Sequence, residues 1–554
     1  MRRRGFVGLS VLCVALSWIT VQGGSTAPAV SAVAPARDAV LTVYPTGIHP
    51  TDIQNVQAAL DAVDPGGTVI LKSTDTGGNP LAFNFGGTKP GDGGVVKLLR
   101  PDITLAGDGW NDALNEPKTK IVGGGGPFKF SSTFSSTGVV FAVNAAGVTI
   151  RELKLTSGFA YSGVIISSAN QQATDDPVVV ENNDLSVLNY AINAVYSGAF
   201  PVTIRHNSLR SVCPIIGQWI GFTLAPIVPY PYDQPVAPTD AGGAVVRYPF
   251  TITGNTTMQT PGTEFVSLQV LGWLNTYSQN PDPEVGVRRL RPNASSPWVY
   301  QYVQGDNGPV VISGNDIVED SPGTYNEAVI LGSGAGGVNH VLFKGNRVRG
   351  ECGAVVIEQG PYGHDNRIED NDFSAAKAYQ QVSIDAADTT LLNNVFGPVL
   401  PLPAEVAMPE GIPQPAVTLI SVQYNPGITP MPNPVEHCVI ARNDYRRTGL
   451  MIGSVLVASQ PELQWAFYFG TVVGTEVKNN MIFESGGFPP GTGQAGDQIL
   501  LLAGLVNPAT SLPYVYDNRV IGLPARGISS PGIGSIVRQT APSRRMLFEE
   551  PPMQ

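Results

Sequence analysis

Cysteine is scarce in this sequence, with four residues, Cys13, Cys213, Cys352 and Cys438, among 554. So sparse a set excludes the dense disulfide framework that holds small secreted domains together. Cys352 and Cys438 stand beside apolar runs, so we expect both to be buried free thiols. Histidine is also rare, with five residues widely spread. Because no Cys or His pair has the spacing of zinc ligands, no such metal site is predicted.

Positive charge is in deficit as well. Only 14% of the residues are charged, and 44 acidic residues outnumber 33 basic ones, for a formal net charge of −11. This balance disfavours nucleic acid or an anionic membrane as a partner, but it allows an acidic polysaccharide held in a locally basic groove. The chain is instead rich in hydrophobic residues (42%), glycine (63 residues) and proline (47 residues). That mixture excludes wholesale disorder and favours a turn-rich β protein.

Hydrophobic runs long enough to span a membrane comfortably are also absent. The longest candidate, 6–19, follows three arginines and precedes small residues, which is the pattern of a secretory signal peptide. We predict a signal peptide over 1–34 and a secreted or periplasmic protein with no stable membrane insertion. Removal of the signal peptide takes away three arginines and no acidic residue, so the net charge falls from −11 to −14. A retained N-terminal anchor is the alternative.

One short phrase recurs along the chain: an apolar residue, any residue, a second apolar residue, two further residues, and an asparagine. The asparagine slot is occupied by Asn183, Asn207, Asn255, Asn315, Asn346, Asn371, Asn394, Asn443, Asn480 and, more weakly, Asn518. The segment 148–155 keeps the pattern with Leu153 in that slot. Several intervals are near 24 residues or twice that, and a period of this size indicates a solenoid.

The apolar alternation within the phrase predicts a β-strand with two side chains inward and the middle one outward. We expect the asparagine to form the tight turn that follows, because it tolerates left-handed backbone angles, and to hydrogen-bond to the equivalent asparagine of the next coil. Each repeat carries another short strand, such as AVVIEQ or QVSIDA. Three strands per coil predict an all-β fold, a parallel β-helix that rises about 4.8 Å per turn.

The N-terminal part of the repeat region predicts a cap. In the segment 51–72, Thr51 stands as an expected helix N-cap with Gln54 three residues later, the pattern of a capping box. One face of this helix carries Ile53, Val56, Leu60 and Val63. A short amphipathic helix of this kind covers the open end of a solenoid. We therefore divide the chain into the signal peptide, an N-terminal cap over 35–66, a β-helix over 67–522 and a Pro-rich tail over 523–554.

The cap helix followed by coils with asparagine turns resembles the right-handed parallel β-helix proteins of the pectin-lyase-like superfamily, over residues 45–522. The resemblance implies the fold, a right-handed solenoid with a short N-terminal capping helix. It implies less about function, because the superfamily includes polysaccharide lyases, galacturonases, uronate epimerases, tailspikes and non-catalytic surface proteins. The motifs of its enzymes are not reproduced here: only Gly-His-Asp at 363–365 partly matches, so no active site is carried over.

Three long interruptions, near 213–247, 271–308 and 397–434, break the rhythm of the coils. Such insertions project from a solenoid and often build its binding site. We expect the second to bind sugars, with aromatic rings that stack on them and arginines that grip uronate carboxylates: Trp273, Trp298, Arg288, Arg289 and Arg291. The alternative is a loop whose aromatic residues pack only on one another.

A second cluster of candidate residues follows the strand AVVIEQ. If AVVIEQ and QVSIDA are equivalent strands of neighbouring coils, Glu358 and Asp385 share one outward column about 5 Å apart. His364 and Asp365 follow on the next turn. Paired carboxylates and a histidine suit general acid–base chemistry, including removal of the proton α to a uronate carboxyl. The alternative is a solvated outer face on which charges are scattered without a role.

Together these patterns predict an exported β-helix protein that is carbohydrate-active on an acidic polysaccharide, with a polyuronate as a candidate substrate. A lyase or an epimerase is favoured over a glycoside hydrolase, and a non-catalytic surface or matrix scaffold is the alternative. No cofactor is predicted, although calcium bound by carboxylate oxygens is compatible with such a fold. The oligomeric state does not follow from the sequence.

Overall fold

The computed structural model describes residues 39–549 with interruptions, the longest at 221–247, 273–287, 290–300, 401–416, 453–466, 484–496, 502–513 and 530–546. The predicted signal peptide lies outside the described residues. Residues from Arg37 onward form one compact unit, described below. In the part of the chain that is described, no helix is long and apolar enough to cross a membrane.

The strands of the repeated phrase form one parallel sheet of 14 strands, which we call the first stack. In order along the stack these are β1 (Val40–Val43), β2 (Thr68–Leu71), β5 (Thr104–Ala106), β11 (Thr149–Arg151), β14 (Val178–Glu181), β17 (Val202–Arg205), β20 (Phe250–Thr253), β25 (Val310–Ser313), β28 (Val341–Lys344), β30 (Arg367–Glu369), β32 (Thr390–Leu392), β37 (Val439–Ala441), β42 (Glu476–Lys478) and β45 (Tyr514–Tyr516). The sheet thus takes one strand from each coil.

The strands that follow the asparagine form the second stack. They are β3 (Phe83–Asn84), β8 (Thr119–Val122), β12 (Leu153–Ser157), β15 (Asp184–Val187), β18 (Ser208–Ser211), β21 (Thr256–Gln259), β26 (Asp316–Asp320), the first parts of β29 (Arg347–Gln359) and β31 (Asp372–Ile384), β33 (Val395–Phe396), β38 (Asp444–Arg446), β43 (Met481–Phe483), β46 (Arg519–Ile521) and β48 (Leu547–Glu549). Neighbouring members pair in parallel, as β15 does with β18 and β18 with β21.

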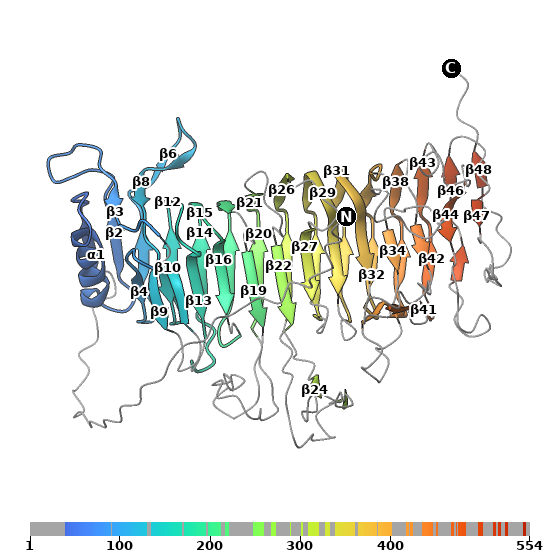
Figure 1. The fold of residues 1–554 in the computed structure, drawn as a ribbon, viewed down its shortest axis with the longest axis horizontal. Helices are drawn as coiled ribbons and strands as arrows, with labels where there is room; N and C mark the ends of the chain where they lie inside the picture. Colours follow the sequence, from blue (N-terminus) through green and yellow to red (C-terminus); the bar gives the residue numbers. More distant parts are fainter. Residues whose placement is uncertain are drawn as a thin grey trace, which may run out of the picture. The chain divides into compact units, whose positions relative to one another are not determined.

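A third stack closes each coil. It contains β4 (Val96–Leu98), β10 (Ser135–Val143), β13 (Ser162–Ser167), β16 (Tyr190–Val195), β19 (Ile216–Ile220), β22 (Leu268–Gly272), β27 (Glu327–Gly332), the second parts of β29 and β31, β34 (Val417–Leu419) and β39 (Leu450–Ile452). The three stacks run side by side from α1 to the C-terminal strands (Figure 1). The predicted all-β fold, a right-handed parallel β-helix, is confirmed.

Short strands also pair outside the three stacks. They are β6 (Trp110–Asn111) with β7 (Glu116–Pro117), β9 (Gly126–Lys129) with β10, β23 (Arg288–Arg289) with β24 (Gln301–Tyr302), β35 (Val422–Tyr424) with β40 (Phe467–Phe469), β36 (Val435–Glu436) with β41 (Val472–Val473), and β44 (Asp497–Leu501) with β47 (Gly527–Ser529).

The core lies inside the coils, where the same position of the phrase is stacked coil upon coil. Ile204, Ile252 and Ile312 are register partners in β17, β20 and β25, and all three are fully buried. Burial of such a column stabilises the fold by about 1.5–3 kcal/mol per side chain. Cys352 and Cys438 are buried free thiols, as predicted, and Cys213 lies outside the described residues.

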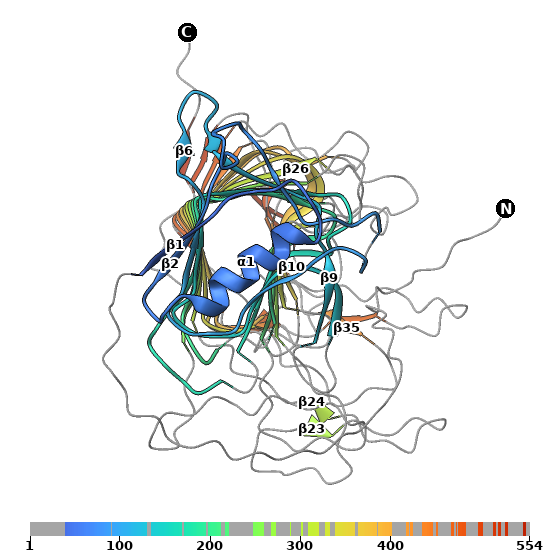
Figure 2. The same cartoon turned by 90° about the vertical axis from the view of Figure 1, so that its left-hand side faces the viewer.

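The predicted cap helix is α1 (Thr51–Ala62), which lies across the open end of the coils (Figure 2). Its apolar face is buried as expected, including Val56 and Leu60. The predicted capping box is wrong, because Thr51 is already helical and the N-cap residue, Pro50, makes no side-chain capping bond. The start of the helix is held instead by Asp52, whose buried carboxylate accepts backbone hydrogen bonds from three residues: Thr46, Gly47 and Asn84.

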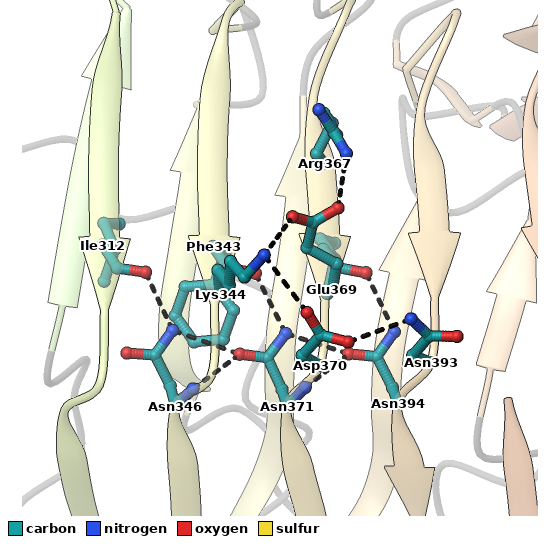
Figure 3. A network of polar contacts seen from close by, with 11 residues as sticks. Ile312, Phe343, Lys344, Asn346, Arg367, Glu369, Asp370, Asn371, Asn393 and Asn394 are labelled. Atoms are coloured by element: carbon teal, nitrogen blue, oxygen red, sulfur yellow. Dashed lines mark hydrogen bonds and ion pairs between the residues drawn. The ribbon is translucent and has the colours of Figure 1, made fainter.

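The predicted asparagine ladder is confirmed from Asn183 to Asn480 (Figure 3). At Asn346, the amide nitrogen Nδ2 donates to the backbone oxygen of Ile312 at 2.9 Å and to Oδ1 of Asn371 at 3.1 Å. The same pattern repeats on the coils before and after, and the backbone N–H of Leu153 donates to Asn183 at the start of the ladder. Asn518 lies outside the described residues.

The expected left-handed conformation of the ladder asparagine is wrong. The residue before it adopts that conformation, as His206 (φ 54°), Gly254 (φ 63°) and Asp370 (φ 59°) show. The asparagine itself must point its amide into the buried corner, where it meets the next coil. The turn is therefore made one residue earlier, by residue types that tolerate positive φ.

Two of the predicted insertions contain strands of the coils. Within 213–247, β19 pairs with β16 and β22, and within 397–434, β34 pairs with β31 and β39. Two short strands also lie in the predicted tail: β47 pairs with β44, and β48 pairs with β46.

Candidate functional site

A shallow groove of about 350 Å³ lies on the outer face of the second stack, over β12, β15, β18 and β21. Its walls are formed chiefly by the two outward residues of each strand, which stand one and three positions after the asparagine slot. Outward positions alternate with buried ones because successive side chains of a strand point to opposite faces. Since the four strands belong to successive coils, the groove runs along the axis of the solenoid.

The N-terminal end of the groove carries a compensated cation. Lys154 in β12 forms ion pairs with Glu116, which lies in the β6–β7 hairpin, and with Asp184 in β15, where the Nζ–Oδ2 distance is 3.4 Å. The hydrogen bond with Glu116, together with both carboxylate charges, raises the pKa of Lys154. The ammonium group is therefore held in its charged form, and its charge is balanced by its neighbours.

The middle of the groove carries a cation in a different state. Arg210 in β18 is exposed, and its guanidinium donates to the sulfur of Met258 at 3.0 Å. Among the described residues it forms no ion pair. The contrast with Arg205 in the same coil is direct, because Arg205 on the first stack lies 2.6 Å from a carboxylate oxygen of Glu181. A guanidinium without a carboxylate partner is suited to bind one from a ligand.

The other outward residues of the groove are mostly hydroxyl-bearing. They are Thr156, Ser186, Ser208 and Thr256. A hydroxyl both donates and accepts hydrogen bonds, so this surface can contact the hydroxyls of neutral sugars as well as water. The groove thus combines one cation without a carboxylate partner among the described residues, one balanced ion pair and several hydroxyl groups.

His364 lies elsewhere, at the corner that leads into the first stack, where its backbone bridges to Asn339 and Ala387. Its Nδ1 is 2.7 Å from Oδ2 of Asp365, and its Nε2 is 3.2 Å from Nδ2 of Asn339. The amide of Asn339 is a donor, so Nε2 accepts and Nδ1–H donates to Asp365. The structure therefore brings His364 and Asp365 together, with both ring nitrogens engaged. The ring of His340 packs edge-on at a centroid distance of 5.7 Å.

The predicted shared column of Glu358 and Asp385 is wrong. The register of β29 and β31 pairs Glu358 with Ile384 and pairs Val356 with Val382. Successive apolar residues in AVVIEQ leave the strand phase ambiguous, and Val355 and Val356 are both buried. The side chain of Glu358 and all of Asp385 lie outside the described part.

The predicted sugar-binding residues are placed only in part. Arg288 and Arg289 form the backbone of β23, and their side chains are outside the described residues. Trp273, Arg291 and Trp298 are outside them entirely. Within the described ranges, no group of three or more His, Cys, Asp or Glu residues is arranged to hold a metal ion, so calcium has no located site there.

The sequence did contain a signal for the groove. Lys154, Asp184 and Ser208 follow the slot residue directly, and Arg210 stands three positions after Asn207. An alignment on the slot would have placed these residues in adjacent outward columns. It would not have separated Arg210 from Arg205, because only side-chain contacts distinguish a paired arginine from one without a carboxylate partner.

Comparisons with known proteins place the chain in no family. No known family and no curated protein matches it. Among solved structures, a PL6 alginate lyase in complex with a trisaccharide is 10% identical, with 90% of this chain and 89% of that one covered and a TM-score of 0.43. PfbA, a surface adhesin of Streptococcus pneumoniae, is 13% identical (89% and 91% covered, TM-score 0.41). The Azotobacter vinelandii mannuronan C-5 epimerase AlgE4 A-module is 11% identical (88% and 95% covered, TM-score 0.32). Likenesses at these values carry no activity over to this chain.

Proposed function

We propose that this protein is carbohydrate-active and binds an acidic polysaccharide in the groove of the second stack. The observation that supports this proposal is the guanidinium of Arg210, exposed at the centre of the groove and without a carboxylate partner among the described residues. A ligand carboxylate would receive two parallel N–H···O bonds from it. The surrounding hydroxyls of Ser186 and Ser208 would contact the sugar ring that bears this carboxylate.

The test is binding of purified protein to acidic and neutral oligosaccharides by isothermal titration calorimetry. A charge-assisted hydrogen bond contributes about 1.5–3 kcal/mol, so Arg210→Gln should weaken binding of an acidic ligand about tenfold or more. Arg205→Gln is the matched control, because it removes an exposed arginine of the same coil from another face. Equal affinities in the two variants would place the binding site elsewhere, and absence of binding to any acidic glycan would refute the proposal.

Turnover by a lyase or an epimerase is a separate part of the proposal, because the candidate base, His364, lies outside the groove, at the corner that leads into the first stack. A histidine oriented by a carboxylate can act as a general base. Here its Nε2 faces the amide of Asn339, which would have to move before this nitrogen could accept a proton. Lys154 is a poorer candidate, because its pKa is raised by Glu116.

Turnover is tested by incubating the protein with pectate, alginate and glycosaminoglycans. New unsaturated ends would indicate elimination, new reducing ends alone would indicate hydrolysis, and changed uronate stereochemistry without cleavage would indicate epimerisation. His364→Ala should abolish the product, and His340→Ala, which changes the neighbouring exposed histidine, is the control. Binding without any product would support the alternative of a non-catalytic surface or matrix protein. Secretion is tested by N-terminal sequencing of the exported form.

A further inference from the structure

We infer that the polysaccharide bound in the groove carries isolated carboxylates among neutral sugars, rather than one carboxylate on every sugar. This inference rests on the proposed function and concerns the pattern of charge along the groove. The cations on this face differ in how far their charge is already balanced. Only one cation that lines the groove, Arg210, lacks a carboxylate partner among the described residues.

Two cations that flank Arg210, Lys154 and Arg349, are already compensated. Arg347, which is exposed in the same strand as Arg349 and forms no ion pair among the described residues, is not one of the residues that line the groove. Toward the N-terminus, Lys154 is paired with Glu116 and Asp184. Toward the C-terminus, Arg349 in β29 holds Asp316 of β26 through two hydrogen bonds of 3.0 and 2.9 Å. A ligand carboxylate at either place would meet an ion pair instead of a free cation. It would therefore lose hydration without gaining a new charge partner.

The register shows how close these acidic groups are to the Arg210 site. Asp184 is the partner of Ser208, so it lies one coil before Arg210, and Asp316 is the partner of Thr256, so it lies two coils after. Coils rise about 4.8 Å each, so the two carboxylates lie within about 5–10 Å of the Arg210 site along the axis. Both carboxylates are already paired, Asp184 with Lys154 and Asp316 with Arg349. A polymer with a carboxylate on each sugar would therefore place its additional carboxylates against charges that are already balanced, where they gain no new partner.

Neutral sugars fit the rest of the groove. Between the charged positions the outward residues are Thr156, Ser186, Ser208 and Thr256, which bind hydroxyls without preference for charge. The net charge of −11 acts in the same direction, because an acidic protein repels a sparsely charged polymer less strongly than it repels a polyanion. One carboxylate per stretch of several sugars therefore matches the groove.

The experiment compares three oligosaccharides of equal length: one with a single uronate among neutral sugars, one composed only of uronates, and one neutral. Calorimetry on the full chain at physiological salt should show the singly acidic ligand binding at least as tightly as the oligouronate. Arg210→Gln should weaken binding of the singly acidic ligand about tenfold, and Arg205→Gln should leave its affinity unchanged.

A gain-of-binding variant gives a second measurement. Asp316→Asn frees the guanidinium of Arg349, so this variant should bind the oligouronate several-fold more tightly. Its affinity for the singly acidic ligand should change little. If the wild-type protein binds the oligouronate tenfold more tightly through Arg210, the inference is overturned while the proposed function stands. If no acidic ligand binds better than the neutral one, the proposed function itself fails, and the inference fails with it.

Discussion

The buried corner and the outer face of the same coils follow opposite rules. In the corner, one residue type recurs, and Asn315, Asn346 and Asn371 each bond to the coil before and the coil after in the same way. On the outer face, the residue directly after the asparagine changes from coil to coil, from Asp184 to Ser208. Figure 3 shows the regular ladder together with a polar network of residues that precede the asparagine slot, which includes Lys344, Glu369 and Asp370.

The difference has a physical cause. A buried amide must satisfy all of its hydrogen bonds, and stacking of identical coils offers one arrangement that does so. The outer face meets water, which satisfies almost any polar side chain, so the fold does not dictate the residue there. Residues that depart from their neighbours on the outer face, as Arg210 departs from Ser186 and Met258, are therefore where function is to be sought.

The largest expected effect is at the ladder itself. Asn346→Ala removes the side-chain bonds to Ile312 and Asn371 and leaves the backbone N–H of Asn315 without its acceptor. Each buried polar group left without a partner costs about 1–3 kcal/mol, so we expect the free energy of unfolding to fall by about 4 kcal/mol. Urea unfolding monitored by circular dichroism measures it.

The control for this variant is Asn393→Gly, on the outer face of the same corner. Asn393 is exposed, its side chain donates to Asp370 at 3.0 Å, and its φ of 55° is one that glycine adopts without strain. Its loss should cost less than about 1 kcal/mol. Equal costs at Asn346 and Asn393 would show that the inner and outer asparagines do not differ as the structure implies.

The next effect concerns Glu327, a half-buried carboxyl at the start of β27. Burial raises the pKa of the Glu327 carboxyl from 4.5 to about 7. Below pH 4.5 the group is protonated in both states and costs nothing. Between about pH 4.5 and 7 the unfolded chain ionises while the folded protein keeps its proton, so the free energy of unfolding falls as the pH rises.

Glu327→Gln should remove this dependence. A shift of this size corresponds to about 3 kcal/mol, so the variant should be more stable than the wild type by up to about 3 kcal/mol at pH 8 and no more stable at pH 4. Urea unfolding at pH 4, 6 and 8 measures the difference. Asp175→Asn, at an exposed position, is the matched control. A constant difference between Glu327→Gln and wild type at all three pH values would contradict the assignment.

The smallest effect concerns a tyrosine in the core. Tyr445 is 1% exposed and stacks on Phe396 at a centroid distance of 5.0 Å, while its hydroxyl has no hydrogen-bond partner among the described residues. Tyr445→Phe removes a desolvated hydroxyl and keeps the stack, so it should stabilise the protein by about 1 kcal/mol. Tyr161→Phe, at a 40% exposed position, should change stability by less than about 0.5 kcal/mol. A loss of stability in Tyr445→Phe would reveal a partner for the hydroxyl.

The sequence by itself determined the coil and its corner. The spacing from Asn183 to Asn207 is the length of one coil, and the apolar alternation before each slot reflects the pleat of a strand. Both patterns involve residues close together in the chain, so the sequence alone reveals them. Even the left-handed residue was visible, since His206 and Gly254 are among the types that adopt positive φ, although the turn was assigned one position too late.

Only the tertiary structure decided which side chains meet across coils. A shift of one residue in the register of β29 and β31 decides whether Glu358 lies beside Asp385, as predicted, or beside Ile384, as observed. A strand with several apolar residues in succession does not specify this register. Likewise, Arg205 and Arg210 look alike in the chain, but Arg205 faces Glu181 across one coil boundary while Arg210 faces Ser186 across the same one. Which residues pair between coils depends on the exact length of every turn in the coil. The local sequence pattern does not encode that total length.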